Sequence, residues 1–214
     1  MRISILVDDI SSWFVPYAID LSEILLKKGH AVTFVHNASE LPGGDICFLL
    51  SCVKLVNKFT LVKYCHNIVI HASDLPKGKG FTPLKWQVLN GENDIVITLF
   101  EAAEAVDAGR YYFKDNIHFE GHELLDEMQD IMAKKIIEMA LRYCDEMNTV
   151  TGIDQEGVES FYPKRTKADD EIDIHKSIVE QFNHFRIADN KRFPLWFSYM
   201  GHKYSIKVEK YRDE

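Results

Sequence analysis

Two apolar runs that each lead into a titratable residue constrain the fold of this chain more than any other feature. Residues 67–70 (NIVI) run directly into His71, and residues 95–100 (IVITLF) lead to an acidic turn that contains Asp107. Short apolar, β-branched runs bounded by turn residues are typical of strands that are buried on both faces. Because ligands of open α/β sheets bind beyond the carboxyl ends of the strands, we expect His71 and Asp107 to meet at that edge.

The segments before residue 67 alternate between strand and helix patterns. A helix is predicted over residues 17–28, where apolar side chains recur at helical spacing between Pro16 and Gly29. Further apolar runs predict strands at residues 3–7, 31–36 and 45–51. This order predicts right-handed parallel connections, so we expect an α/β fold, a Rossmann-like domain with a parallel central sheet. No GxGxxG pattern follows the first strand, which argues against an NAD- or FAD-dependent enzyme.

The second half of the chain predicts a smaller appendage. Periodic apolar residues over 121–147 indicate a long amphipathic helix, and the polar residues after it predict that the chain leaves the main domain. We therefore expect a first domain at residues 1–150 and a C-terminal extension at residues 151–214. Shorter elements are expected as strands at 111–113 and 117–119, a helix at 175–189 with Ile178, Phe182, Phe185 and Ile187 inward, and a hairpin of strands at 193–198 and 203–209.

Composition narrows the function classes. A chain of 214 residues with 46% hydrophobic and 27% charged residues has the composition of an ordinary globular protein. Its net charge of −8 argues against a general nucleic-acid binder. The four cysteines form no CxxC pair, which favours reduced thiols in a cytoplasmic protein, and no apolar run has the ~20 residues of a membrane span. His118 and His122 lack a third ligand, so we expect no metal site.

A continuous motif extends from His71 to Gly109. Its parts are VIHASDLP at 69–76, Lys79-Gly80, Pro83, Gly91-Glu92, VIT at 96–98 and Asp107-Ala108-Gly109. This motif resembles that of the formyltransferases that use 10-formyltetrahydrofolate. A second region resembles the tail of the nucleotide-sugar members of that family, and it consists of PKRT at 163–166, Asp169-Asp170, Arg186 and Phe193-Pro194.

The resemblance implies catalytic roles for two residues, His71 and Asp107. His71 would contact the oxyanion and move protons, Asp107 would tune that histidine, and Ser73 is a further candidate beside them. In the family, an asparagine two positions before the histidine donates a hydrogen bond to the formyl oxygen, whereas this chain has Val69 there. Three explanations are open: a donor from elsewhere (Ser73, Asn67 or a backbone amide), which we prefer, catalysis by the histidine alone, or binding without efficient turnover.

The resemblance also implies where two substrates bind. The pterin ring of the folate is expected against a strand end and the acidic loop, with contacts from Leu49, Leu50, Ile97, Phe100, Glu101, Val106 and Asp107. The acceptor is expected near the loop after the first strand and near the basic glycine turn, where lysines can pair with a diphosphate. The candidate acceptor contacts are Ser11, Trp13, Lys77, Lys79 and Gly80.

These inferences together favour a cytoplasmic N-formyltransferase. We expect it to transfer a formyl group from 10-formyltetrahydrofolate to the amine of a UDP- or dTDP-linked 4-amino-4,6-dideoxy sugar. The alternatives are a 10-formyltetrahydrofolate hydrolase and a non-catalytic folate- or nucleotide-sugar-binding protein. Methionyl-tRNA is less expected as the acceptor, because the chain is acidic. Aromatic residues crowd the hairpin at 193–209 and need a covering surface, which, together with the resemblance, predicts a homodimer.

Overall fold

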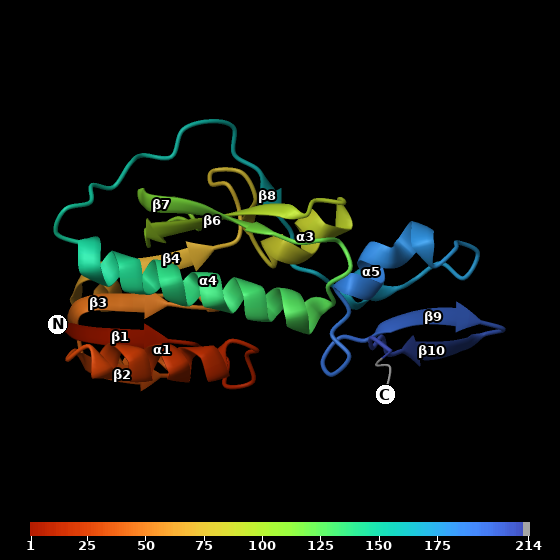
Figure 1. Ribbon diagram of the computed structural model, residues 1–214, viewed down its shortest axis with the longest axis horizontal. Helices are drawn as coiled ribbons and strands as arrows, with labels where there is room; N and C mark the ends of the chain where they lie inside the picture. The colour runs from red at the N-terminus through yellow and green to blue at the C-terminus, as the bar shows by residue number, and fades with distance from the viewer. Residues whose placement is uncertain (212–214) are drawn as a thin grey trace.

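A six-stranded sheet forms the centre of the molecule, which the computed structural model describes over residues 1–211 (Figure 1). The strands, in the order in which they lie side by side, are β2 (Ala31–Val35), β1 (Arg2–Leu6), β3 (Gly44–Leu49), β4 (Tyr64–His71), β6 (Asp94–Glu101) and β7 (Tyr111–His118). The first four are parallel to one another. The expected α/β fold with a mostly parallel sheet is therefore confirmed.

The last two strands reverse direction, which the sequence pattern did not predict. β6 is antiparallel to β4, so that His71 at the end of β4 pairs with Thr98 inside β6. The carboxyl ends of these two strands therefore do not share one edge, and the expected reason for their two polar residues to meet is wrong. Instead, residues 102–110 turn back after β6 and bring Asp107 to His71.

The expected hairpin over residues 111–119 is also wrong. The structure has one strand, β7, because Lys114 and Asn116 continue the pairing with β6 opposite Thr98 and Val96. The polar residues that suggested a turn instead alternate along a strand at the edge of the sheet. Lys114 donates a hydrogen bond to Asp74 outside the sheet.

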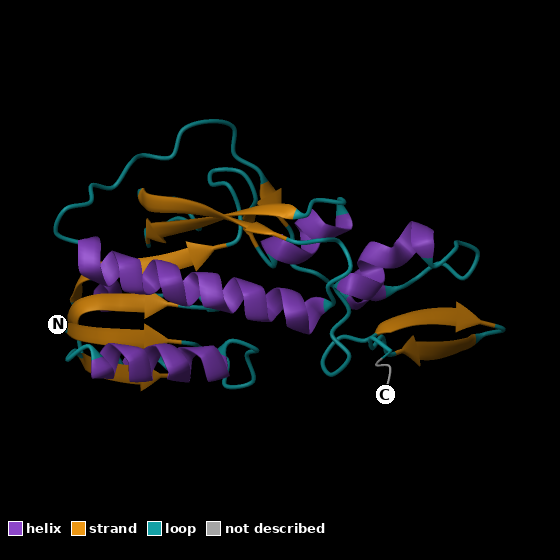
Figure 2. Cartoon of the chain, viewed as in Figure 1, coloured by secondary structure: helices purple, strands orange, loops and turns teal. Residues whose placement is uncertain are grey.

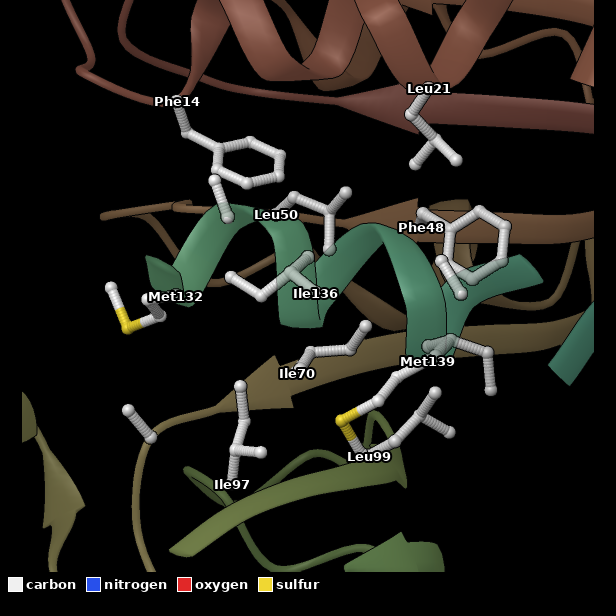
Figure 3. Packing of buried hydrophobic residues seen from close by; sticks show 14 of the residues in the cluster. Phe14, Leu21, Phe48, Leu50, Ile70, Ile97, Leu99, Met132, Ile136 and Met139 are labelled. Atoms are coloured by element: carbon white, nitrogen blue, oxygen red, sulfur yellow. The ribbon is translucent and has the colours of Figure 1, made fainter. Parts of the chain in front are cut away.

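Two helices cover one face of the sheet. α1 (Val15–Lys27) and α4 (Leu125–Glu146) both lie there and are joined by a hydrogen bond from the Tyr17 hydroxyl to Asp130 (Figure 2). Figure 3 shows Ile136 of α4 between Leu50 and Ile70 in this core. The opposite face is covered by the shorter elements η1 (Ala38–Glu40) and α2 (Lys58–Leu61), over a separate cluster that includes Leu49.

Residues that follow α4 return to the sheet. The two-residue strand β8 (Phe161–Tyr162) pairs in parallel with β5 (Lys79–Gly80). The Gln155 amide donates hydrogen bonds to the carbonyl oxygens of Asp107 and Gly109. The domain boundary expected at residue 150 lies inside this packing, and we propose that the extension begins after Tyr162.

The extension contains short elements where one long helix was expected. η2 (Lys167–Asp170) precedes η3 (Val179–Gln181), α5 (Phe182–Arg186) and the hairpin of β9 (Leu195–Tyr199) and β10 (His202–Ile206). The Gln181 side-chain amide donates hydrogen bonds to the carbonyl oxygens of Lys176 and Ser177, which a continuous helix would bond through its own backbone. Ile178 and Phe182 are exposed rather than inward, while Phe185 and Ile187 are buried as expected.

One arginine joins the extension to the first domain. Arg186 is 1% exposed, and its guanidinium lies 3.6 Å from the Glu123 carboxylate. It also donates hydrogen bonds to the side-chain oxygens of Asn93 and Asn183. Burial lowers the pKa of Arg186, but the group stays charged because the shift starts from 12.5. The extension therefore has a buried polar anchor at its junction with the first domain.

No helix within residues 1–211 is both long enough and apolar enough to cross a bilayer.

Candidate active site

A cavity of about 440 Å³ opens at the end of β4. Its walls come from the loop after β1, the loop after β3, the end of β4, helix α3 (Pro83–Leu89), residues 102–107 and one side of α4. This volume is in the range of small-molecule sites. The site residues predicted from the sequence that line it are Trp13, Leu49, Leu50, His71, Gly80, Phe100, Val106 and Asp107.

His71 and Asp107 form the polar centre of this cavity. The His71 Nε2 atom lies 2.9 Å from the carbonyl oxygen of Gly78 and 3.7 Å from Asp107 Oδ2. Because a carbonyl oxygen only accepts, Nε2 carries the hydrogen and Nδ1 holds the lone pair. A neighbouring carboxylate stabilises the positive charge that forms when Nδ1 accepts a proton. The pair is therefore arranged to work as a general base and then a general acid.

The backbone places Asp107 by an unusual conformation. Asp107 has φ of +50°, a left-handed value that aspartate tolerates better than most residues. Its Oδ2 atom accepts a hydrogen bond of 2.9 Å from the N–H of Gly80. Gly80 itself has φ of +96°, and a Cβ there would lie 2.5 Å from the carbonyl oxygen of Tyr162. The basic glycine turn therefore holds the carboxylate through its backbone.

Three of the residues predicted for catalysis or folate binding do not line the cavity. Ile97 is fully buried in the core beneath α4 (Figure 3). The Glu101 carboxylate accepts hydrogen bonds from the Asn67 N–H and the Tyr112 hydroxyl, so it is already occupied. Ser73 is 2% exposed, and its hydroxyl has no partner within residues 1–211. Alternation along the strand explains Ile97, since it shares the core-facing side of β6 with Leu99, whereas Phe100, which lines the cavity, lies outside that cluster.

Most of the residues predicted to contact the acceptor and its phosphates do not line the cavity. Lys79 is 2% exposed, and its ammonium pairs with Glu159 at 2.6 Å, so it is not available to a diphosphate. Lys77 is exposed and does not line the cavity. The Ser11 hydroxyl is bonded to Asp9 outside the cavity. Of the acceptor contacts predicted from the sequence, the cavity wall contains Trp13 and Gly80.

The position of the missing asparagine is part of the wall. Val69 lines the cavity two residues before His71, on the same side of the strand. The two side chains predicted as replacement donors do not line it: Ser73 is buried, and the Asn67 amide donates to the carbonyl of Leu61. A side-chain donor for the formyl oxygen must therefore come from another part of the cavity.

Sequence reasoning missed several cavity residues. Thr82, Lys85 and Gln129 line the wall, and none of their side chains has a hydrogen-bond partner within residues 1–211. Gln129 carried a recognisable signal, because it is a polar residue on the apolar stripe of the long helix that also presents Leu125 to the cavity. Lys85 lies in a short helix without clear periodicity, and no pattern in the neighbouring sequence indicated that it lines a cavity.

Two ionisable groups of the wall have perturbed acidity. Burial lowers the pKa of Lys85. Burial raises the pKa of Cys52 to about 12, which keeps its thiol neutral and unsuited to nucleophilic attack. Within residues 1–211, no three His, Cys, Asp or Glu side chains are grouped so that they could hold a metal ion. The wall thus combines an apolar surface with one histidine, one aspartate and one lysine of functional interest.

Comparison with known sequences identifies the family. The sequence profile described as formyl transferase matches residues 28–142, which is more than half of the chain and includes both His71 and Asp107. A methionyl-tRNA formyltransferase of Thermosipho melanesiensis is 35% identical over 124 residues. That match covers 56% of this chain but 39% of the relative, so the chain spans about two fifths of that protein.

Solved structures share the fold at low sequence identity. The methionyl-tRNA formyltransferase from Clostridium thermocellum superposes with a TM-score of 0.83 at 18% identity, covering 99% of this chain and 94% of that one. HypX from Aquifex aeolicus, in complex with tetrahydrofolic acid, gives 0.80 at 18%, with 97% and 37% covered. A 4-N formyltransferase from Francisella tularensis gives 0.75 at 18%, with 99% and 98% covered. The family profile and the shared fold agree, and the chain belongs to the formyl transferase family.

Proposed function

We propose that this protein transfers a formyl group from 10-formyltetrahydrofolate to the amine of a nucleotide-linked amino-deoxy sugar. The observation that carries the proposal is the His71–Asp107 pair, 3.7 Å apart, in the wall of a largely apolar cavity. A pterin ring needs such apolar walls, and Leu49, Val69 and Phe100 supply them. The similarity to a structure that contains tetrahydrofolic acid and to a 4-N formyltransferase supports both substrates.

The chemistry follows from the proton positions at His71. The acceptor amine attacks the formyl carbon and forms a carbon–nitrogen bond, while Nδ1 takes the proton that the amine loses. The tetrahedral intermediate collapses when the bond from the formyl carbon to the folate N10 breaks, and the same proton passes to N10. Asp107 stabilises the imidazolium between these steps. The products are an N-formyl sugar and tetrahydrofolate.

Formyl transfer to a panel of acceptors tests this function. Mass spectrometry should detect a formylated UDP- or dTDP-amino sugar when the protein is incubated with 10-formyltetrahydrofolate. Formate release without an acylated sugar would instead indicate the hydrolase. Methionyl-tRNA belongs in the panel as the second candidate acceptor, because the matched curated relatives are methionyl-tRNA formyltransferases. The net charge of −8 weakens that candidate, since tRNA binding needs cationic surface.

Restoring the asparagine at position 69 tests whether another group supplies the missing donor. We expect Val69→Asn to change turnover by less than ~10-fold, since loss of a needed donor would be worth ~10²–10³. Val69→Leu is the control for altered volume at this wall position. An increase of ~10-fold or more, seen with asparagine and not with leucine, would mean that the wild-type protein lacks the donor.

We also propose that the protein is a homodimer formed through the hairpin. β9 contributes Leu195 to a small cluster with Ile172 and Phe185, so part of the hairpin is covered within the chain. Other apolar side chains of this region are exposed, and these are Phe193, Tyr199, Met200 and Tyr204. Figure 2 shows the hairpin at the end of the molecule farthest from the N-terminus. Such a patch is better satisfied by a second copy.

Light scattering checks the dimer. The full-length protein should have about twice the 24.8 kDa mass of one chain, and a truncation after Asp189 should be a monomer that still binds tetrahydrofolate. A full-length protein that is monomeric at tens of micromolar would contradict the dimer, whatever the truncated form does.

A further inference from the structure

Lys85 is a lysine of the cavity wall with no counter-charge in contact. It lies in the first turn of α3, and its side chain forms no hydrogen bond or ion pair within residues 1–211. Burial lowers the pKa of its ammonium, so holding the charge there costs free energy in the absence of an anion. A half-buried charge without a partner in the wall of an open cavity is suited to a ligand of opposite charge.

The charged groups around Lys85 are already engaged with one another. Arg165 pairs with Asp170 at 2.6 Å. Arg192 pairs with Asp9 at 3.0 Å. Arg165, Asp170 and Arg192 act on Lys85 through their charges, as does Asp189 of the extension. Among Lys85, Arg165 and Arg192, Lys85 is therefore the cation without an ion-pair partner, and it is available to an external anion.

The Asp189 carboxylate is committed to the backbone. Its Oδ1 atom accepts hydrogen bonds from the N–H groups of Lys191 at 3.1 Å and Arg192 at 2.9 Å. These bonds hold the turn between α5 and β9, where α5 lies beside α3 at the junction with the extension (Figure 1). Asp189 therefore raises the pKa of Lys85 from a distance but does not neutralise it through contact.

The two sides of the cavity differ in chemistry. Leu49, Leu61 and Val69 belong to the cluster on the sheet face opposite α4, and they give that side an apolar wall. The α4 side contains Lys85 of α3 and Gln129 of α4, and Trp13, which packs against the core cluster of that face, also lines the cavity. A planar, uncharged ring fits the first side and an anion fits the second. His71 lies at the end of β4, within reach of both.

We infer that the Lys85 ammonium binds a phosphate group of the acceptor on the α4 side of the cavity, leaving the opposite side to the folate. This inference rests on the proposed function, because a nucleotide-linked acceptor carries that phosphate. It assigns to Lys85 the role that the sequence pattern gave to Lys77 and Lys79. The glycine turn then acts on catalysis through its backbone, and α3 supplies the cation for the diphosphate.

Titration calorimetry with inorganic pyrophosphate, UDP and tetrahydrofolate tests the inference. Lys85→Met removes the charge at similar length and should weaken pyrophosphate and UDP binding by roughly 10- to 100-fold. The affinity for tetrahydrofolate should stay within about twofold, which also shows that the variant is folded. Lys85→Arg should keep most of the phosphate affinity, and Lys77→Met, an exposed lysine outside the cavity, should leave all three affinities unchanged.

Several outcomes would overturn the inference. Pyrophosphate or UDP affinity that is unchanged in Lys85→Met, or absent from the unaltered protein, means that Lys85 does not bind phosphate. Weakened tetrahydrofolate binding with unchanged pyrophosphate binding means that the lysine serves a folate carboxylate. These results are separate from the proposed function. A formylated sugar made by Lys85→Met with an unaltered KM refutes the inference alone. Absence of any formylated sugar, with Lys85-dependent pyrophosphate binding, refutes the function alone.

Discussion

Replacing Asp107 with asparagine should lower the turnover of formyl transfer by ~10² or more while the protein stays folded. Asparagine tolerates the left-handed backbone of this position, and its side-chain oxygen can still accept the N–H of Gly80. The variant therefore removes the negative charge beside His71 and little else. Without that charge, the imidazolium formed during proton transfer is less stable. Steady-state assays of kcat with saturating substrates measure the effect.

His71→Ala should produce a loss of at least ~10² as well, because it removes the group that carries the proton. The double variant should be little worse than either single one, since residues that act as a unit are not additive. Asp74→Asn is the matched control. Asp74 lies three residues after His71, but it pairs with Lys114 outside the cavity. Near-normal turnover in either His71→Ala or Asp107→Asn would refute the assignment of this pair.

Replacing Arg186 with methionine should lower the free energy of unfolding by about 3–5 kcal/mol. The change leaves Glu123 buried without its cation and removes the donors to Asn93 and Asn183. Burial alone would raise the pKa of Glu123, but backbone N–H donors, including those of Glu120 and Gly121, hold it below its ordinary value. The carboxylate therefore stays charged at neutral pH after the arginine is lost, which makes the loss costly.

Urea unfolding followed by circular dichroism measures this loss. Adding Glu123→Gln to Arg186→Met should recover part of the stability, because the uncompensated charge disappears. Lys134→Met removes an exposed ion pair with Asp130 on α4 and should leave the unfolding midpoint nearly unchanged. A midpoint shift for Arg186→Met as small as that of Lys134→Met would show that the arginine does not anchor the extension.

Local sequence patterns predicted most of the elements but not their directions. The apolar runs before His71 and Asp107 correctly indicated two buried strands, because burial on both faces demands such residues. An apolar run does not indicate whether its strand lies parallel or antiparallel to its neighbours. The antiparallel direction of β6 therefore could not be predicted from the sequence. The helix expected at 175–189 is not continuous, and there the Gln181 side chain bonds the carbonyl oxygens of Lys176 and Ser177 in place of the helix backbone.

Whether a site residue could be predicted from the sequence depended on how far its partners lie along the chain. His71 and Asp107 could be identified because a motif spans both. Lys79 was predicted to contact phosphate because its partner, Glu159, is 80 positions away and no residue near Lys79 indicates that pairing. Lys85 was missed because its significance comes from having no partner, which only the packing of the extension against α3 reveals.

Residues 152–162 determine where a chimera between this chain and a relative should be joined. Gln155 holds the loop of Asp107, the Ser160 hydroxyl accepts the N–H of Gly78, and Tyr162 pairs with Gly80. This segment therefore acts as a brace, because it holds the loop that contains Asp107 and the turn that contains Gly78 and Gly80. A chimera joined at residue 150 would combine one protein's loops with another's brace. A junction placed after Tyr162 would keep each pair of loops with the brace that it folded against.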